Sequence, residues 1–177
     1  MVAIACIDEN NGIGKDGKLL MSIPEDMSFF RETTKNSIVV MGRKTLFSFK
    51  DKKPLKNRIN VVFTNDDSLK NDYKDYDNIY FIKRINDLTK IEEKYPEKKV
   101  FLIGGSTIYN MLIDFCNECL ITRICYSFKS DTYFPNLEEH KFIKKEESEE
   151  KEYEGFKYRF IKYIKNKNEK NNKKTYI

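Results

Sequence analysis

The chain has 177 residues, of which 40% are hydrophobic and 34% charged, and its formal net charge is +5. This length and balance are typical of one soluble globular domain with a core of its own. A membrane-spanning helix is excluded, because the longest apolar runs, such as residues 100–103, are far shorter than the roughly 20 residues that a bilayer requires. Residues 1–7 lack the basic start and cleavage site of a signal peptide, so we expect a cytoplasmic location.

Short apolar, β-branched runs alternate with helical patterns along the chain. The alternation predicts a single α/β domain over residues 1–164, with a mostly parallel mixed sheet. From residue 119 onward strand follows strand without a helix, which predicts antiparallel C-terminal strands at the sheet edge. Strands are predicted at 2–8, 37–41, 59–64, 79–82, 99–103, 119–127 and 156–164, with a weaker one at 141–148; helices are predicted at 24–34, 43–49, 85–94 and 106–114.

Glycines punctuate the segment between the first strand and the first helix. Gly12, Gly14 and Gly17 match the G-x-G-x-x-G pattern, but the helix that a dinucleotide-binding fingerprint requires does not follow them directly. Residues 9–23 are therefore predicted to form a long loop. Two interpretations stay open, a functional lid and a plain flexible connection.

An acidic residue occupies an unusual place on the first predicted helix. At about 100° per residue, Asp26 falls roughly 40° from Phe30, on the flank of the apolar face, whereas Glu25 and Glu32 are assigned to the solvent face. Acidic side chains are rarely buried without a partner. Asp26 is therefore expected to be paired, or to bind or protonate a ligand.

Two segments have the composition of anion-binding turns. Residues 39–45 lead from a buried strand through Gly42 into a helix that begins with Arg43 and Lys44. Residues 100–109 run from a buried strand into two consecutive glycines and a helix with hydroxyls in its first turn. Consecutive glycines permit close approach of a ligand to the main chain. We expect both segments to bind phosphate.

The four cysteines and the single histidine do not suggest a metal site. Cys116 and Cys119 precede a strand instead of opening a helix, and Cys6 and Cys125 stand alone in strand-like runs. His140 lies in a charged stretch, which argues against histidine-based catalysis. The cysteines are interpreted as reduced structural thiols, and no metal is expected.

The excess positive charge lies at the C-terminal end. Residues 162–177 carry six lysines and one glutamate, and their net charge of +5 equals that of the whole chain. Residues 165–177, rich in lysine and asparagine, are predicted to form a disordered tail. An arm that binds nucleic acid or a membrane surface is the less favoured alternative, and neither partner is expected.

Taken in order, these segments resemble dihydrofolate reductase. The matching pieces are residues 5–10, 13–14, 24–30, 40–45, 58–62, 103–109, 122 and 131–135, so the resemblance extends from residue 1 to about residue 164. It implies an eight-stranded mixed sheet flanked by four helices. It also implies an enzyme, expected to be monomeric, that transfers a hydride from NADPH to C6 of dihydrofolate with protonation at N5 and binds antifolate inhibitors.

The resemblance also implies a substrate site. Asp26 would bind the pterin and favour its protonation, Thr122 would hydrogen-bond the Asp26 carboxylate, and Arg58 would hold the glutamate α-carboxylate of folate. The carbonyls of Ile4 and Ile103 would accept hydrogen bonds from the 4-amino group of antifolates. The remaining residues implied for the substrate site are Ala5, Cys6, Met27, Phe30, Phe49, Leu55 and Tyr109.

A cofactor site is implied in the same way, with a basic pair that favours NADPH over NADH. The nicotinamide would lie near Cys6, Ile13, Gly14 and Leu19. Phosphates would be held by Gly42, Arg43, Lys44 and Thr45, and by Ile103, Gly104, Gly105, Ser106, Thr107 and Ile108. Thr64, Asn65 and Lys83 would read the adenosine 2′-phosphate. The peptide bond between Gly104 and Gly105 is expected to be cis.

The chain departs from the family at one position of the site. Members usually have Pro-Trp where this chain has Leu20 and Met21, and the chain contains no tryptophan. Methionine cannot donate the hydrogen bond with which an indole positions water. An altered water network beside the acid is therefore predicted at Met21.

Two other functions were weighed against this one. A reductase of the same fold that acts on the ribosylaminopyrimidine of riboflavin synthesis shares the double-glycine segment but lacks this helix acid. A non-catalytic protein that binds NADPH or nucleic acid is the second alternative. The set of Asp26, Arg58 and Thr122 argues against it.

Overall fold

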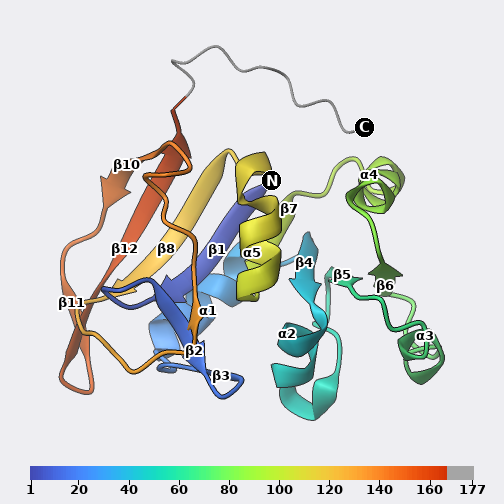
Figure 1. Ribbon diagram of the computed structural model, residues 1–177, viewed down its shortest axis with the longest axis horizontal. Helices are drawn as coiled ribbons and strands as arrows, with labels where there is room; N and C mark the ends of the chain where they lie inside the picture. The colour runs from blue at the N-terminus through green and yellow to red at the C-terminus, as the bar shows by residue number, and fades with distance from the viewer. Residues whose placement is uncertain (167–177) are drawn as a thin grey trace.

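A mixed sheet forms the centre of the computed structural model, which describes residues 1–166. Eight strands hydrogen-bond in the order β10-β12-β8-β1-β7-β4-β5-β6, and the short β11 pairs with β12 (Figure 1). Pairing is parallel from β8 to β6 and antiparallel at β12, β10 and β11. The strands are β1 Val2–Ile7, β4 Ile38–Gly42, β5 Ile59–Phe63, β6 Ile79–Ile82, β7 Val100–Gly104, β8 Glu118–Ile124, β10 Phe142–Glu147, β11 Lys151–Tyr153 and β12 Phe156–Lys165.

Helices cover both faces of this sheet, which is why its central parallel strands are apolar on both sides. One core cluster contains Leu88 and Ile91 of α4 and Leu112 of α5, and the other contains Leu46 of α2 and Leu69 of α3, with Phe29 and Phe30 of α1 packed against it. In Figure 1, α5 crosses in front of β1 and β7, and α1 lies behind the sheet. The helices are α1 Pro24–Thr33, α2 Arg43–Ser48, α3 Leu69–Asp72, α4 Ile85–Lys94 and α5 Ser106–Leu112, with 3₁₀ turns η1 Lys50–Lys52 and η2 Ile113–Phe115.

The predicted α/β fold, with a mostly parallel mixed sheet and antiparallel C-terminal strands, is confirmed. Most strand boundaries agree with the predicted ones within one or two residues, and β8 ends three residues early, at Ile124. β8 pairs parallel with β1, so the antiparallel part begins only at β12, which lies between β8 and the edge strand β10. The four-residue helix α3 was not predicted.

The prediction that residues 9–23 form a loop without strands is wrong. Within them, β2 (Gly12–Lys15) and β3 (Lys18–Leu19) form a hairpin, and β2 also pairs with β9 (Thr132–Tyr133). The carboxylate of Asp131 accepts a hydrogen bond of 2.8 Å from the Asp16 amide. The segment 130–135 thus stabilises this hairpin. The contact joins residues more than a hundred positions apart, so local sequence patterns do not reveal it.

The last strand extends slightly beyond the predicted domain. Lys165 pairs with Phe142 as the final residue of β12, so the domain includes this lysine. Within the predicted tail, residues 167–177 lie outside the described residues. Among residues 1–166, no helix combines the length and apolar character needed to cross a bilayer.

Candidate active site

Asp26 and Thr122 meet where α1 lies against β8. The Thr122 hydroxyl, which is 1% exposed, donates a hydrogen bond of 2.5 Å to Oδ1 of Asp26. Pro24 starts the helix at its first position, which its fixed φ favours, and this places Asp26 in the first turn. The sequence-based expectation that Asp26 is paired and that Thr122 is its partner is therefore met by the geometry.

Burial dominates the electrostatics of this carboxyl group. It raises the pKa of Asp26 above its ordinary value, and the hydrogen bond from Thr122 only partly offsets it. The groups that interact with Asp26 are weak acids: burial and the Asp26 charge together raise the pKa of the Cys6 thiol, and burial raises the pKa of the Tyr109 hydroxyl. Asp26 is thus the strongest acid of the cluster, and burial makes it keep its proton to a higher pH than an exposed aspartate would.

An apolar wall lies next to this acid. Ile4 and Ile103 are buried in the same core cluster, and Phe30, Phe49 and Leu55 pack against it. All five were predicted to line the substrate site, and the structure brings them together. Met27, predicted for the same wall, is 38% exposed.

Arg58 is held by the C-terminal end of α1. Its Nε donates to Oγ1 of Thr34 at 3.0 Å, and its two terminal nitrogens donate to the carbonyl oxygens of Arg31 and Lys56 at 3.0 and 3.1 Å. The guanidinium carbon lies 6.0 Å from the centre of the Phe30 ring. These bonds use three of its five N–H donors, so its fork is fixed in place with donors left for a carboxylate.

The two glycine segments lie side by side. A side chain at Gly42 would come within 3.0 Å of Ile108, and one at Gly105 would meet the Thr45 hydroxyl at 3.5 Å. The peptide bond between Gly104 and Gly105 is cis, as expected. Two segments that the sequence separates by about sixty residues therefore form one surface, in which Gly42 and Gly105 are partly exposed and Gly104 is buried.

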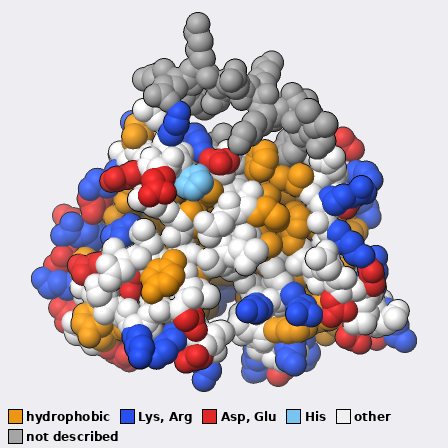
Figure 2. All heavy atoms as spheres, viewed as in Figure 1, with side chains coloured by type: hydrophobic (Ala, Val, Ile, Leu, Met, Phe, Trp, Pro, Cys, Tyr) orange, Lys and Arg blue, Asp and Glu red, His pale blue; other side chains and the backbone are white. Residues whose placement is uncertain are grey.

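Positive charge gathers next to this surface. Figure 2 shows Lys and Arg side chains grouped over α2, and Arg43 and Lys52 both lie against the ring of Phe47. Thr64 follows β5, and its amide bonds to the Ile82 carbonyl, which places Thr64 beside the end of β6 and Lys83. Lys44 and Asn65 are exposed there.

Two acidic residues that the sequence analysis did not single out bind these cations. Asp66 pairs with Arg43 at 3.0 Å, and Asp67 pairs with Lys83 at 2.6 Å. Their position in a run of polar residues after a strand predicted only a loop. Each of these cations would have to be shared with, or released to, an incoming phosphate.

The residues predicted near the nicotinamide pack against different parts of the core. Ile13 packs against one core cluster, whereas Cys6 packs against a separate one built on Ile23, Ile124 and Tyr158, which also includes Met21. Leu19 is 58% exposed on β3. Ser106, predicted to hold phosphate, donates instead to the Tyr133 carbonyl at 2.6 Å, which attaches α5 to β9.

Sequence reasoning missed two further anchoring acids. Asp8 is fully buried, and its carboxylate accepts hydrogen bonds from the amides of Asn10, Gly12 and Phe128 at 2.7 to 2.9 Å. Glu25, predicted to face solvent, accepts hydrogen bonds from two residues of the C-terminal strands. The short polar run after the first strand is a signal for Asp8, since such runs form Asx turns. Glu25 has no local signal.

Comparison with known proteins agrees with this arrangement. A profile described as dihydrofolate reductase matches residues 1–165. Dihydrofolate reductase of Sus scrofa is 33% identical over 92% of this chain and 96% of its own length, and that of Bacillus subtilis is 30% identical over 94% and 95%. A solved structure of dihydrofolate reductase from Enterococcus faecalis, complexed with NADP(H) and RAB-propyl, superimposes with a TM-score of 0.77 at 29% identity over 93% of this chain and 95% of that one. The chain belongs to the dihydrofolate reductase family.

Proposed function

We propose that the chain reduces 7,8-dihydrofolate to 5,6,7,8-tetrahydrofolate with NADPH, by hydride transfer to C6 and protonation at N5. The observation that carries the proposal is the Asp26 carboxyl group, bonded to Thr122 in an apolar wall that raises its pKa. A same-fold reductase of riboflavin synthesis and a non-catalytic protein are disfavoured by the family match over residues 1–165.

Asp26 is assigned the pterin end of the substrate. A carboxylate in an apolar wall can hold an amide-like edge by paired hydrogen bonds, and its raised pKa lets it keep a proton to a higher pH than an exposed aspartate does. Arg58 is assigned the glutamate α-carboxylate, supported by the three bonds that fix its guanidinium fork. Inhibitors that mimic the pterin would bind to the same carboxylate and to the carbonyls of Ile4 and Ile103.

The surface formed by the two glycine segments fits NADPH. A side chain at Gly42 would come within 3.0 Å of Ile108, so glycine lets the two segments pack closely enough for one ligand to contact both. Arg43 and Lys83 are assigned to the phosphates, with Thr64 and Asn65 beside them. When bound, NADPH supplies the hydride, while the residues of this chain orient the substrate and provide the proton.

A reducing compartment suits the four cysteines, all of which are free. On this ground we propose a cytoplasmic location. The lysine-rich end carries no assigned role in the reaction.

Dihydrofolate-dependent oxidation of NADPH tests the proposed function. We expect turnover by the parent and a loss of roughly 100-fold or more in Asp26→Asn, because the amide cannot deliver the proton. Glu32→Gln, at an exposed acid of the same helix, serves as the matched control and should keep full turnover. Absence of turnover in the parent, or equal turnover in Asp26→Asn and the control, would refute the assignment.

A further inference from the structure

Two consecutive carboxylates at the start of α1 are held by two adjacent strands. Asp26 accepts from Thr122 of β8, and Glu25 accepts from the hydroxyl of Tyr158 of β12 at 2.6 Å. In the ladder Tyr158 lies opposite Ile124, two residues from Thr122, so both hydroxyls project from the same face of the sheet. The first turn of α1 is thereby fixed in rotation and in height above the strands.

Lys151 completes the binding of Glu25. It lies directly opposite Tyr158 in the β11–β12 ladder, and its Nζ is 2.8 Å from Oε1 of Glu25. Hydrogen bonds from Lys151 and Tyr158 lower the pKa of Glu25, so this carboxylate stays ionised at neutral pH. The three side chains Glu25, Lys151 and Tyr158 are called the clamp below.

The tyrosine is the buried member of the clamp. Tyr158 is 3% exposed, and its bond to a carboxylate is charge-assisted, the stronger class of hydrogen bond. The ion pair is weaker, because the side chains of Lys151 and Glu25 are 40% and 50% exposed. Loss of the Tyr158 hydroxyl should therefore be felt more than loss of the Lys151 charge.

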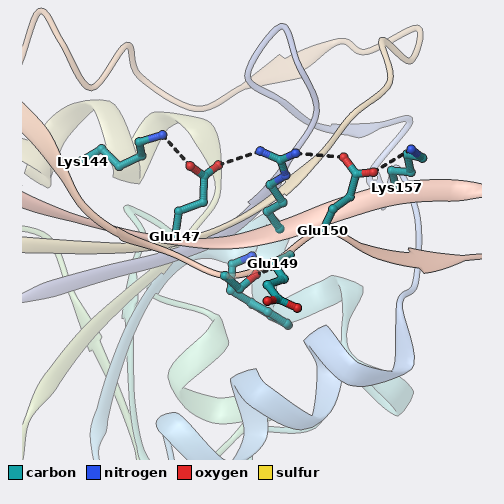
Figure 3. Close-up of polar contacts among 8 residues, drawn as sticks. Lys144, Glu147, Glu149, Glu150 and Lys157 are labelled. Atoms are coloured by element: carbon teal, nitrogen blue, oxygen red, sulfur yellow. Dashed lines mark hydrogen bonds and ion pairs between the residues drawn. The ribbon is translucent and has the colours of Figure 1, made fainter.

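An ionic ladder on the opposite face of β12 holds the segment that carries Lys151. Arg159 bridges Glu147 and Glu150 at 3.4 and 3.0 Å, and Lys144 and Lys157 complete the row (Figure 3). Glu150 immediately precedes Lys151. The clamp is thus supported by an ordered strand pair and does not depend on a free surface loop.

No capping side chain secures α1 from within. Its N-cap residue, Ile23, makes no side-chain hydrogen bond, so the helix start lacks the usual local anchor. One turn further on, the Phe29 and Phe160 rings pack with their centres 5.1 Å apart. The clamp, Thr122, this ring pair and the packing of Ile23 against Ile124 and Tyr158 fasten the start of α1 to β8 and β12.

We infer that Glu25 and Tyr158, with Lys151, are positioning residues that hold the Asp26 carboxylate in its half-buried place beside Thr122. They touch neither reacting atom and act through the first turn of α1. The inference rests on the proposed role of Asp26. It says that turnover depends on these three residues, although they lie outside the reacting site.

The expected direction follows from the groups around Asp26. Thr122 faces it from β8, Cys6 from β1, Tyr109 from α5 and Tyr158 from β12. Burial and the bond to Glu25 raise the pKa of Tyr158 to about 12, and the pKa values of Cys6 and Tyr109 are raised as well, so these three groups stay neutral at neutral pH. A loosened helix start would expose Asp26 to water and lower its pKa, because burial is the main cause of the raised value.

Tyr158→Phe tests the inference, since it removes one hydroxyl and keeps the ring. The midpoint of the pH–rate profile, and that of the Asp26 carboxyl followed by carbon-13 NMR, should both move to lower pH. Turnover above the midpoint should fall about threefold. Tyr163→Phe removes a hydroxyl from the other face of the same strand, where Tyr163 packs against a different core cluster, and should leave both midpoints in place.

Substitutions at Glu25, the exposed partner of Tyr158, keep the test valid if Tyr158→Phe fails to fold. Glu25→Ala should reproduce the shift of both midpoints to lower pH. Glu25→Gln should retain most of the parent behaviour, because its amide oxygen still accepts from Tyr158. The double variant of Glu25→Ala and Tyr158→Phe should shift the midpoints no further than either single variant. Lower stability with unchanged midpoints in Tyr158→Phe and Glu25→Ala would overturn the inference. Lack of turnover in the parent would refute the proposed function and not this inference, because the NMR titration of Asp26 does not require turnover.

Discussion

The hydroxyl of Tyr109 donates a hydrogen bond of 2.7 Å to the carbonyl oxygen of Ile4, which joins α5 to β1 in the interior of the protein. Tyr109 is 4% exposed and Ile4 is 5% exposed, so water cannot replace either partner. The Ile4 carbonyl therefore depends on the Tyr109 hydroxyl for this hydrogen bond.

Tyr109→Phe should therefore destabilise the protein by about 1–2 kcal/mol, because the Ile4 carbonyl loses a buried donor. Urea unfolding at pH 7 measures this change. The matched control is Tyr133→Phe. Tyr133 is 46% exposed and its hydroxyl donates to the Ser130 carbonyl at 2.9 Å, so this variant should change stability by less than about 0.5 kcal/mol. Equal losses in the two variants would contradict the expectation.

Asp26→Asn should stabilise the protein above the pKa of Asp26 while it abolishes turnover. The folded state raises this pKa, so it binds the proton more tightly than the unfolded chain, and the parent loses stability as pH rises from the unfolded to the folded value. The amide carries no charge to bury, and its oxygen can still accept from Thr122. Unfolding at pH 8 should show a gain that shrinks toward pH 4, and a gain independent of pH would argue against this explanation.

Thr122→Val should move the pH–rate profile in the direction opposite to Tyr158→Phe. The threonine bond lowers the pKa of Asp26 against the effect of burial, so its removal lets the pKa rise further. The missing bond should also cost about 1–3 kcal/mol of stability at pH 7. Comparison of the pH–rate midpoints in parent and variant measures the effect, and a midpoint at lower pH in Thr122→Val would be inconsistent with it.

Met21→Trp should change both turnover and antifolate affinity. Met21 packs in the cluster of Ile23, Ile124 and Tyr158, where the larger indole ring should cost about 1–3 kcal/mol of packing strain. The indole also adds the N–H donor that methionine lacks. Met111→Trp, at a methionine that is 45% exposed on α5, controls for the ring itself. Unchanged turnover and unchanged inhibitor affinity would disprove a role for position 21 in organising water.

Periodic elements were predictable because their signal is local. The buried strands β4 and β7 are continuous apolar runs, and α4 repeats its apolar residues at helical spacing, so each could be recognised from a short window. The β2–β3 hairpin could not, because its two strands are short and β2 depends on β9, which lies more than a hundred residues away. The four-residue α3 is too short to show a period.

The same distinction applies to the site. Asp26 was recognisable from its place on one helix, and the double glycine from its place after one strand. The bond between Glu25 and Tyr158 spans 133 residues, and the pairing of Asp66 with Arg43 joins a loop to the start of α2. Neither contact could be recognised from a local stretch of the sequence. Contacts of this kind arise from the strand order, which the sequence pattern constrains only loosely.

Burial also sorts the four thiols by reactivity. Cys116 and Cys119 are buried and Cys6 is partly covered, with raised pKa values that suppress the thiolate, whereas Cys125 is exposed just beyond β8. An alkylating reagent applied to the folded protein should therefore modify Cys125 first. That gives a single attachment point for a fluorophore or a spin label without any engineered substitution.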